Sequence, residues 1–98
     1  MGYAYIIECA DGVYYSGSTV DLDKRMNQHS TGQIGYTAKR RPLKLVWAME
    51  FPSVREAYAF ERRLHGWSRR KKKALIDGDL NMLKFLSKRR GGLPRERE

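Results

Sequence analysis

The sequence has little cysteine, no long apolar run and few acidic residues. Cys9 is the single cysteine among 98 residues, which excludes an internal disulfide and a cysteine-based zinc cluster. We expect it to be a small buried side chain in a reducing compartment. No apolar stretch approaches the ~20 residues that a membrane span needs, and the first residues lack the basic flank and apolar core of a secretory signal. We therefore expect a cytoplasmic protein.

Acidic residues are too few to balance the basic ones. Twenty Lys and Arg against eleven Asp and Glu give a net charge of +9 and a pI near 10.0. Such a charge on a small domain repels itself and is typical of a nucleic-acid-binding protein. We expect two basic clusters to contact phosphates: Lys39, Arg40 and Arg41, and then Arg69, Arg70, Lys71, Lys72 and Lys73. A solvated helix face is the alternative for the second cluster.

The length and the apolar content predict one folded domain. A chain of 98 residues is too short for two ordinary domains, and 41% hydrophobic residues can form a modest core although 32% are charged. We assign the domain to residues 1–90. The Gly, Pro and alternating charges of residues 91–98 predict a disordered tail.

Residues 3–9 and 13–18 predict a β-hairpin. Both segments are rich in aromatic and β-branched side chains, and the turn signal Asp11-Gly12 separates them. Gly17 near the end of the second strand allows a bulge or the close approach of another group. The alternative is that Gly17 is an ordinary strand residue.

The rest of the chain predicts one more strand and four helices. Residues 43–51 alternate as a strand, and residues 32–42 have no period and predict a loop. Helix starts are expected at Asp21, Ser53, Ser68 and Asp79, and helix ends near Gly32, Gly66 and Gly78. In the last helix we expect Leu80 and Leu83 to face inward.

Five polar residues supply complementary parts for phosphate chemistry: Tyr5, Tyr15, Arg25, His29 and Glu61. Arg25 and His29 are one helical turn apart and lean the same way. A guanidinium binds a phosphate through two donors and could favour the phenolate of a nearby tyrosine. Glu61 is a hard oxygen ligand suited to Mg²⁺ or Mn²⁺, with a rim residue paired to a neighbouring arginine as the alternative.

These residues carry a resemblance to the GIY-YIG nuclease family over about residues 3–76. The matching segments are Tyr3-Ala4-Tyr5, Tyr15-Ser16-Gly17, Asp21-Leu22-Asp23-Lys24-Arg25, His29 and Glu61. Three further segments are similar to the small standalone bacterial members: Cys9-Ala10-Asp11-Gly12, residues 36–46 and Gly66-Trp67-Ser68-Arg69. Several short motifs in the right order are far more specific than any one of them.

The resemblance implies an α+β fold with a central three-stranded antiparallel sheet flanked by helices. It also implies a metal-dependent endonuclease. Tyr5 and Tyr15 match the two active-site tyrosines of the family. Arg25 matches its catalytic arginine, and His29 a frequent active-site position. Glu61 matches the metal-binding glutamate, which would hold one Mg²⁺ or Mn²⁺ ion.

The resemblance further implies a role in DNA repair or in processing branched or single-stranded DNA, with DNA expected ahead of RNA. In larger members of the family, separate DNA-binding domains determine the specificity for DNA, so a protein partner could supply that specificity here. The alternative is a non-catalytic nucleic-acid-binding module, or an adaptor on the same scaffold.

Overall fold

The structure, a computed structural model, describes residues 1–84 and divides into two compact units, Met1–Gly66 and the unit that begins at Trp67. The first unit contains, in order, β1 (Gly2–Glu8), β2 (Tyr14–Thr19), α1 (Leu22–Ser30), α2 (Gly35–Ala38), β3 (Lys44–Phe51) and α3 (Val54–His65). The second unit contains α4 (Arg69–Asp77) and a helical segment from Leu80. The predicted tail, residues 91–98, lies outside the described residues, and the single domain over residues 1–90 stays a prediction.

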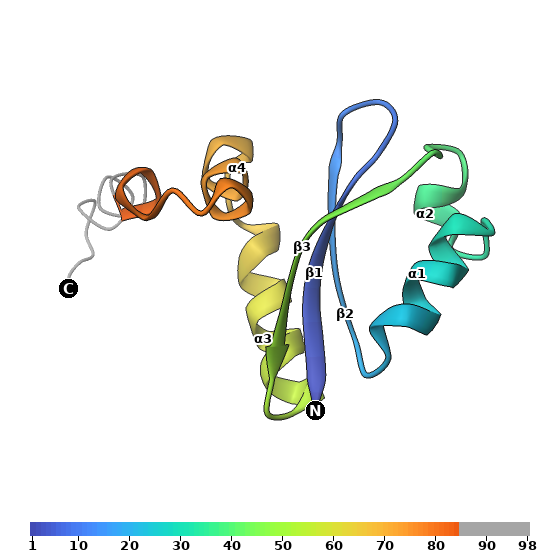
Figure 1. The fold of residues 1–98 in the computed structure, drawn as a ribbon, viewed down its shortest axis with the longest axis horizontal. Coiled ribbons are helices and arrows are strands. Elements are labelled where there is room, and N and C mark those ends of the chain that lie inside the picture. Colours follow the sequence, from blue (N-terminus) through green and yellow to red (C-terminus); the bar gives the residue numbers. More distant parts are fainter. Residues whose placement is uncertain (85–98) are drawn as a thin grey trace. The chain divides into compact units, whose positions relative to one another are not determined.

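The three strands form one antiparallel sheet in the order β2-β1-β3 (Figure 1). The predicted hairpin and the predicted third strand are therefore confirmed. Gly12 has a φ of 84° in the turn between β1 and β2, a conformation that suits glycine. Because β1 is central, β2 forms one edge of this sheet.

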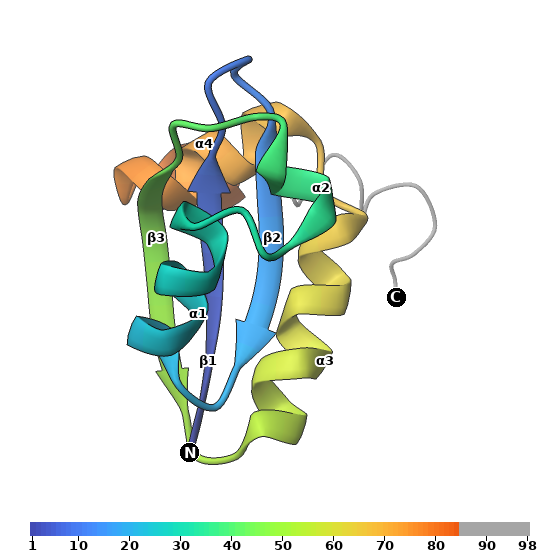
Figure 2. The same ribbon diagram turned by 90° about the vertical axis from the view of Figure 1, so that its right-hand side faces the viewer.

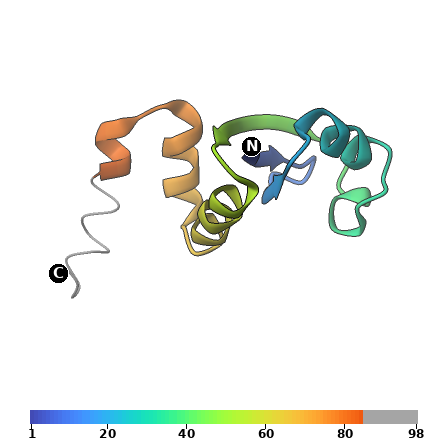
Figure 3. The ribbon, with the colours of Figure 1, turned by 90° about the horizontal axis from the view of Figure 1, so that it is seen from below.

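Helices cover both faces of the sheet. Figures 1 and 3 show α1 and α2 on one face and α3 on the other, and Figure 2 looks at the face that α1 covers. Side chains alternate along a strand, so Tyr5 and Ile7 point to the α1 face, where they pack with Leu22 and Met26. The alternate residues, Ala4 and Ile6, are fully buried on the α3 face.

The predicted helix starts are confirmed by their caps. The side chains of Asp21, Ser53 and Ser68 accept hydrogen bonds from the backbone N–H groups of Lys24, Glu56 and Lys71, respectively. Two predictions were wrong. The predicted loop contains the single turn of α2, which is too short to show a period. Leu80, expected to face inward, is 68% exposed.

No helix among residues 1–84 is long and apolar enough to cross a membrane. Cys9 is buried directly after β1, as the sequence predicted, and its thiol is free.

The buried hydroxyl of Ser16 on β2 is expected to destabilise the folded protein. The residue is 3% exposed, and this hydroxyl has no hydrogen-bond partner in the described part of the chain. We expect Ser16→Ala to raise the free energy of unfolding by about 1 kcal/mol, because a buried unpaired hydroxyl is costly. Urea denaturation measures this change. Thr19→Val is the control: the Thr19 hydroxyl bonds to Asp21, so this variant should be less stable than the wild type. A loss of stability in Ser16→Ala would contradict the prediction.

Candidate active site

Two tyrosines from neighbouring strands stand on the face that α1 covers. Tyr5 is fully buried and pairs across the sheet with Gly17, whereas Tyr15 is partly buried and pairs with Ile7. The rings of both tyrosines meet the ring of His29 edge-on, with centroids 5.7 Å apart for Tyr5 and 5.4 Å apart for Tyr15. The imidazole on α1 therefore joins the two motifs that the sequence singled out.

A chain of hydrogen bonds runs through the buried part of this site. The Tyr5 hydroxyl lies 3.0 Å from Nε2 of His29, and Nδ1 of His29 lies 2.7 Å from Oγ1 of Thr37. The Thr37 hydroxyl donates in turn to the carbonyl of Ile34 at 3.3 Å. Tyr5, His29 and Thr37 are each at most 1% exposed, so these bonds are shielded from bulk solvent.

Burial sets the ionisation of the tyrosines and the histidine. Burial raises the pKa of Tyr5 to about 12, although the neighbouring Arg25 guanidinium favours the phenolate. Burial, followed by the charge of Glu61, also raises the pKa of Tyr15. Burial, followed by repulsion from Arg25, lowers the pKa of His29 to about 4, so its ring is neutral at pH 7. Arg25 acts on the tyrosines as the sequence suggested, but burial has the larger effect and both remain phenols.

Glu61 reaches the site from α3 and is only 9% exposed. Ser18 on the edge strand β2 donates a hydrogen bond of 3.1 Å to its Oε1, and His65, one turn later on α3, hydrogen-bonds its Oε2. Burial is the main cause of the raised pKa of both Tyr5 and Tyr15, and the negative charge of Glu61 adds to it. Glu61 is thus held by a serine and a histidine, and the alternative of a rim residue paired with an arginine was wrong.

Gly17 leaves the space that the Tyr5 phenol occupies. A Cβ atom on Gly17 would lie 2.3 Å from the hydroxyl oxygen and 2.5 Å from Cζ of Tyr5, closer than non-bonded atoms approach. The sequence allowed a bulge or a close approach at this glycine. The structure shows a close approach, and the register shift of the sheet lies elsewhere, between Ile6 and Ile7.

A further aromatic contact connects α2 to the second motif. Tyr36 stacks on Tyr15 with ring centroids 5.2 Å apart, and the Arg40 guanidinium lies 4.3 Å from the centroid of Tyr36. Arg40 also forms an ion pair of 3.1 Å with Asp11 in the hairpin turn. Arg40, predicted to contact phosphates, is therefore engaged in contacts within the protein.

The other basic residues predicted to contact phosphates fall into two groups. Lys39, Arg69 and Arg70 are exposed. The others are partly buried or engaged within the protein. Arg41 donates to the carbonyls of Ser30 and Ala38, and Lys71 lies over the Trp67 ring. Lys73 pairs with Asp77, and Lys72 is partly buried. Their role in binding stays a prediction.

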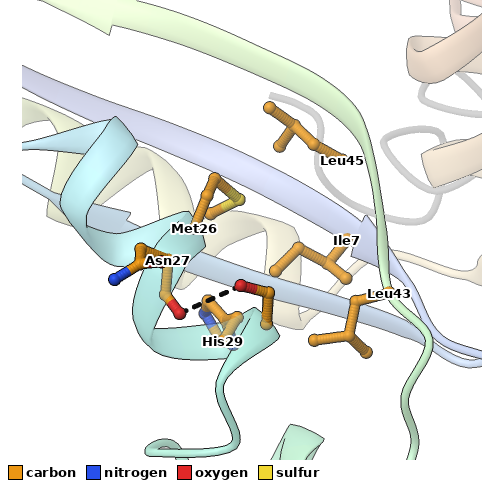
Figure 4. A pocket seen from close by; sticks show the side chains of 7 residues that line it. Ile7, Met26, Asn27, His29, Leu43 and Leu45 are labelled. Carbon is orange, nitrogen blue, oxygen red and sulfur yellow. Dashed lines mark hydrogen bonds between the residues drawn. The ribbon is translucent and has the colours of Figure 1, made fainter.

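A small pocket of about 280 Å³ borders the site between α1 and the beginning of β3 (Figure 4). Its lining is mainly apolar: Ile7, Met26, Leu43 and Leu45, with Asn27, His29 and Ser30. Tyr15, Arg25 and Glu61 do not line it. The pocket therefore meets the polar cluster only at His29.

Sequence reasoning missed three residues that hold the site: Ser18, Thr37 and His65. His65 could have been found, because residues four apart on a helix are neighbours and it follows Glu61 at that spacing. Thr37 carried no signal, since it lies in the segment that the sequence predicts to be a loop.

Known proteins resemble the chain over most of its length. The family described as "GIY-YIG catalytic domain" matches residues 1–74. The UPF0213 protein BH0048 of Halalkalibacterium halodurans is 44% identical over 75 residues, which are 76% of this chain and 80% of that protein. A UPF0213 protein of Streptococcus pneumoniae is 36% identical over 94 residues, which are 93% of this chain and 95% of that protein.

A solved structure agrees with the fold. The solution NMR structure of the UPF0213 protein BH0048 from Bacillus halodurans has a TM-score of 0.52 at 43% identity and covers 79% of this chain and 84% of its own. The α+β fold with a three-stranded antiparallel sheet, implied by the resemblance, is confirmed. The family match includes all five candidate site residues and more than half of the chain. The chain therefore belongs to the GIY-YIG family, whose domains act on nucleic acids.

Proposed function

We propose that this chain is a divalent-metal-dependent endonuclease that hydrolyses nucleic-acid phosphodiesters, DNA ahead of RNA, in the repair or processing of branched or single-stranded DNA. The observation that carries the proposal is the buried hydrogen bond between Tyr5 and His29, with Arg25 and Glu61 acting on the same phenol. A proton acceptor, a cation and a carboxylate together are the parts that phosphodiester hydrolysis requires.

Tyr5 is the proposed base, and His29 receives its proton. With a pKa of about 12, only about one Tyr5 in 10⁵ is a phenolate at pH 7, so the phenol must pass on its proton as it accepts another. In the proposed step the attacking water gives a proton to the Tyr5 oxygen, and the Tyr5 proton moves to Nε2 of His29. The resulting hydroxide adds to phosphorus while the bond to the leaving oxygen breaks. The leaving oxygen takes the electron pair of the broken bond and a proton from solvent, and His29, with a pKa of about 4, gives up to solvent the proton that it received.

Arg25 is the proposed phosphate ligand. Its guanidinium can bind two phosphate oxygens at once and stabilise the additional negative charge of the transition state. It lies on α1 one turn before His29, so the same helix presents the phosphate ligand and the proton acceptor.

Glu61 is the proposed protein ligand for one divalent ion. No group of three or more His, Cys, Asp or Glu that could hold a metal occurs within residues 1–84, so water and phosphate oxygens would complete the coordination. This fits Mg²⁺ or Mn²⁺, which keep several waters and bind through one or two carboxylates. The bound ion would neutralise charge on the leaving oxygen. The hydrogen bonds of Ser18 and His65 orient the carboxylate for this role.

A cleavage assay tests the proposal. Purified protein is incubated with labelled single-stranded, double-stranded and branched DNA and with matched RNA, in Mg²⁺, in Mn²⁺ and in EDTA. We expect metal-dependent product from DNA, and we expect Arg25→Ala to lower its rate by about 10²-fold through loss of charge stabilisation. Lys24→Ala, which removes one exposed positive charge from the same helix, should cleave at nearly the wild-type rate.

Salt-sensitive binding without product in either metal would favour the alternative, a non-catalytic binding module. Repeating the assay with protein purified together with its cellular partners tests whether a partner protein supplies specificity. Equal product in EDTA would contradict the metal-dependent reaction.

A further inference from the structure

Thr37 is buried in the middle of the site, yet the proposed reaction does not use it. The residue is 0% exposed and its hydroxyl lies 2.7 Å from Nδ1 of His29, on the opposite side of the imidazole from Tyr5. A neutral imidazole carries one proton, so one ring nitrogen donates and the other accepts. The partner at Nδ1 therefore determines what Nε2 can do.

The hydrogen-bond partners determine which groups donate and which accept between Tyr5, His29 and Thr37. The Tyr5 hydroxyl has a proton to donate, because its pKa is raised, and the hydrogen-bond acceptor beside it is Nε2 of His29. Arg25 also acts on this phenol but has donors only, whereas Tyr15 and Glu61 act on it through charge. If Tyr5 donates to Nε2, then Nδ1 carries the ring proton and donates to Thr37, whose own hydroxyl donates to the Ile34 carbonyl. Every proton in this arrangement has an acceptor.

The reverse direction leaves a buried donor unpaired. If the Thr37 hydroxyl donated to Nδ1, then Nε2 would carry the proton and donate to the Tyr5 oxygen. The Tyr5 proton would then have no acceptor among the described residues, at a residue that is 0% exposed. An unpaired buried hydroxyl is costly, whereas the first arrangement has none.

We infer that Thr37 is a positioning residue that holds His29 as the Nδ1–H tautomer and so keeps Nε2 open to the Tyr5 proton. The importance of this tautomer for cleavage rests on the proposed function, since the acceptor matters only if Tyr5 acts as the base. The tautomer itself is a property of the folded protein.

The test begins with the wild-type protein. Long-range proton–nitrogen correlation NMR spectra of ¹⁵N-labelled protein distinguish a protonated ring nitrogen from an unprotonated one. The sequence has two histidines, so a His65→Gln variant assigns the signals of His29. We expect Nδ1 of His29 to be protonated and Nε2 unprotonated at pH 7. A protonated Nε2 in the wild type overturns the inference without any further variant.

Variants at position 37 then separate positioning from packing. Thr37→Val keeps the shape of the side chain but removes the acceptor for Nδ1–H. We expect the His29 ring-nitrogen signals of this variant to shift toward those of the Nε2–H tautomer. Thr37→Ser keeps the hydroxyl and should keep the wild-type spectrum. Thr31→Val is the matched control, because the Thr31 hydroxyl is exposed and donates to backbone carbonyls of α1. A wild-type His29 spectrum in folded Thr37→Val would also overturn the inference.

Cleavage rates complete the test. We expect kcat of Thr37→Val to fall by about 10- to 100-fold, the usual cost of removing a group that orients a functional histidine, with KM little changed and with recovery in Thr37→Ser. An equal loss of rate in Thr37→Ser and Thr37→Val would mean that packing alone matters and would overturn the positioning role. If the wild type does not cleave but shows the expected tautomer, the proposed function fails and the assignment of His29 stands.

Discussion

Glu61→Gln is expected to lower metal-dependent cleavage by about 10³-fold or more. The substitution keeps the size of the side chain and removes its charge, and a metal ion supplies several kcal/mol of transition-state stabilisation. The amide can still accept a hydrogen bond from Ser18, so the fold should be retained. Cleavage rates over a series of Mg²⁺ and Mn²⁺ concentrations measure the effect, and Mn²⁺ binding measured by electron paramagnetic resonance gives the affinity independently.

Two serines on β2 provide controls for the Glu61 prediction. Ser18→Ala removes one hydrogen bond to the carboxylate, so it should require about 10-fold more metal while approaching the wild-type rate at saturation. Ser16 lies two residues away on the same strand and its hydroxyl makes no hydrogen bond to Glu61, so the metal dependence of Ser16→Ala should be that of the wild type. Unchanged cleavage by Glu61→Gln would exclude Glu61 as the metal ligand.

Gly17→Ala is expected to lower cleavage strongly by displacing the Tyr5 phenol. The added methyl group would overlap the phenol by more than soft packing allows, since it would lie 2.3 Å from the hydroxyl oxygen. The ring cannot move away freely, because it is fully buried against His29. We expect a loss of about 1–3 kcal/mol in the free energy of unfolding. We also expect cleavage to fall by about 10²- to 10⁴-fold, the range for losing a general base. Urea denaturation and single-turnover cleavage measure the two effects.

A double-mutant cycle shows whether Gly17→Ala acts through the phenol. Tyr5→Phe removes the hydroxyl of the proposed base, so adding Gly17→Ala to Tyr5→Phe should cost little further activity. Losses in the two single variants that multiply in the double variant would mean that Gly17 serves another purpose. Tyr3→Phe, two residues earlier on β1 and only partly buried, should cleave at nearly the wild-type rate.

Local signals in the sequence were enough to predict most of the fold. The hairpin followed from two strand-forming segments around Asp11-Gly12, and the helix starts followed from Asp21, Ser53 and Ser68, because turn and cap chemistry depend on a few neighbouring residues. The approach of Tyr5, Tyr15 and His29 was also predictable, since a hairpin and the helix after it bring nearby segments together. The grouping with Glu61 depended on a family resemblance.

Contacts between distant segments could not be predicted from the sequence. Ser18 and Glu61 are 43 residues apart, and their hydrogen bond exists only because α3 packs along β2. The pKa of Tyr5 depends on burial, which no local pattern reports, so the sequence revealed the favourable charge of Arg25 but not the larger opposing effect. Thr37 lies in a one-turn helix whose residues have no periodic signal.

The boundary after Gly66 separates the candidate site residues from most of the net positive charge. All five candidate site residues precede this boundary, whereas the unit from Trp67 carries eleven of the twenty Lys and Arg but four of the eleven Asp and Glu. Its net charge is +7, against +2 for the unit that holds the site. If the basic residues of the second unit bind nucleic acid as predicted, we expect substitutions there to change affinity for a polyanion more than the rate of cleavage. Affinity and rate would then be free to evolve separately in one short chain.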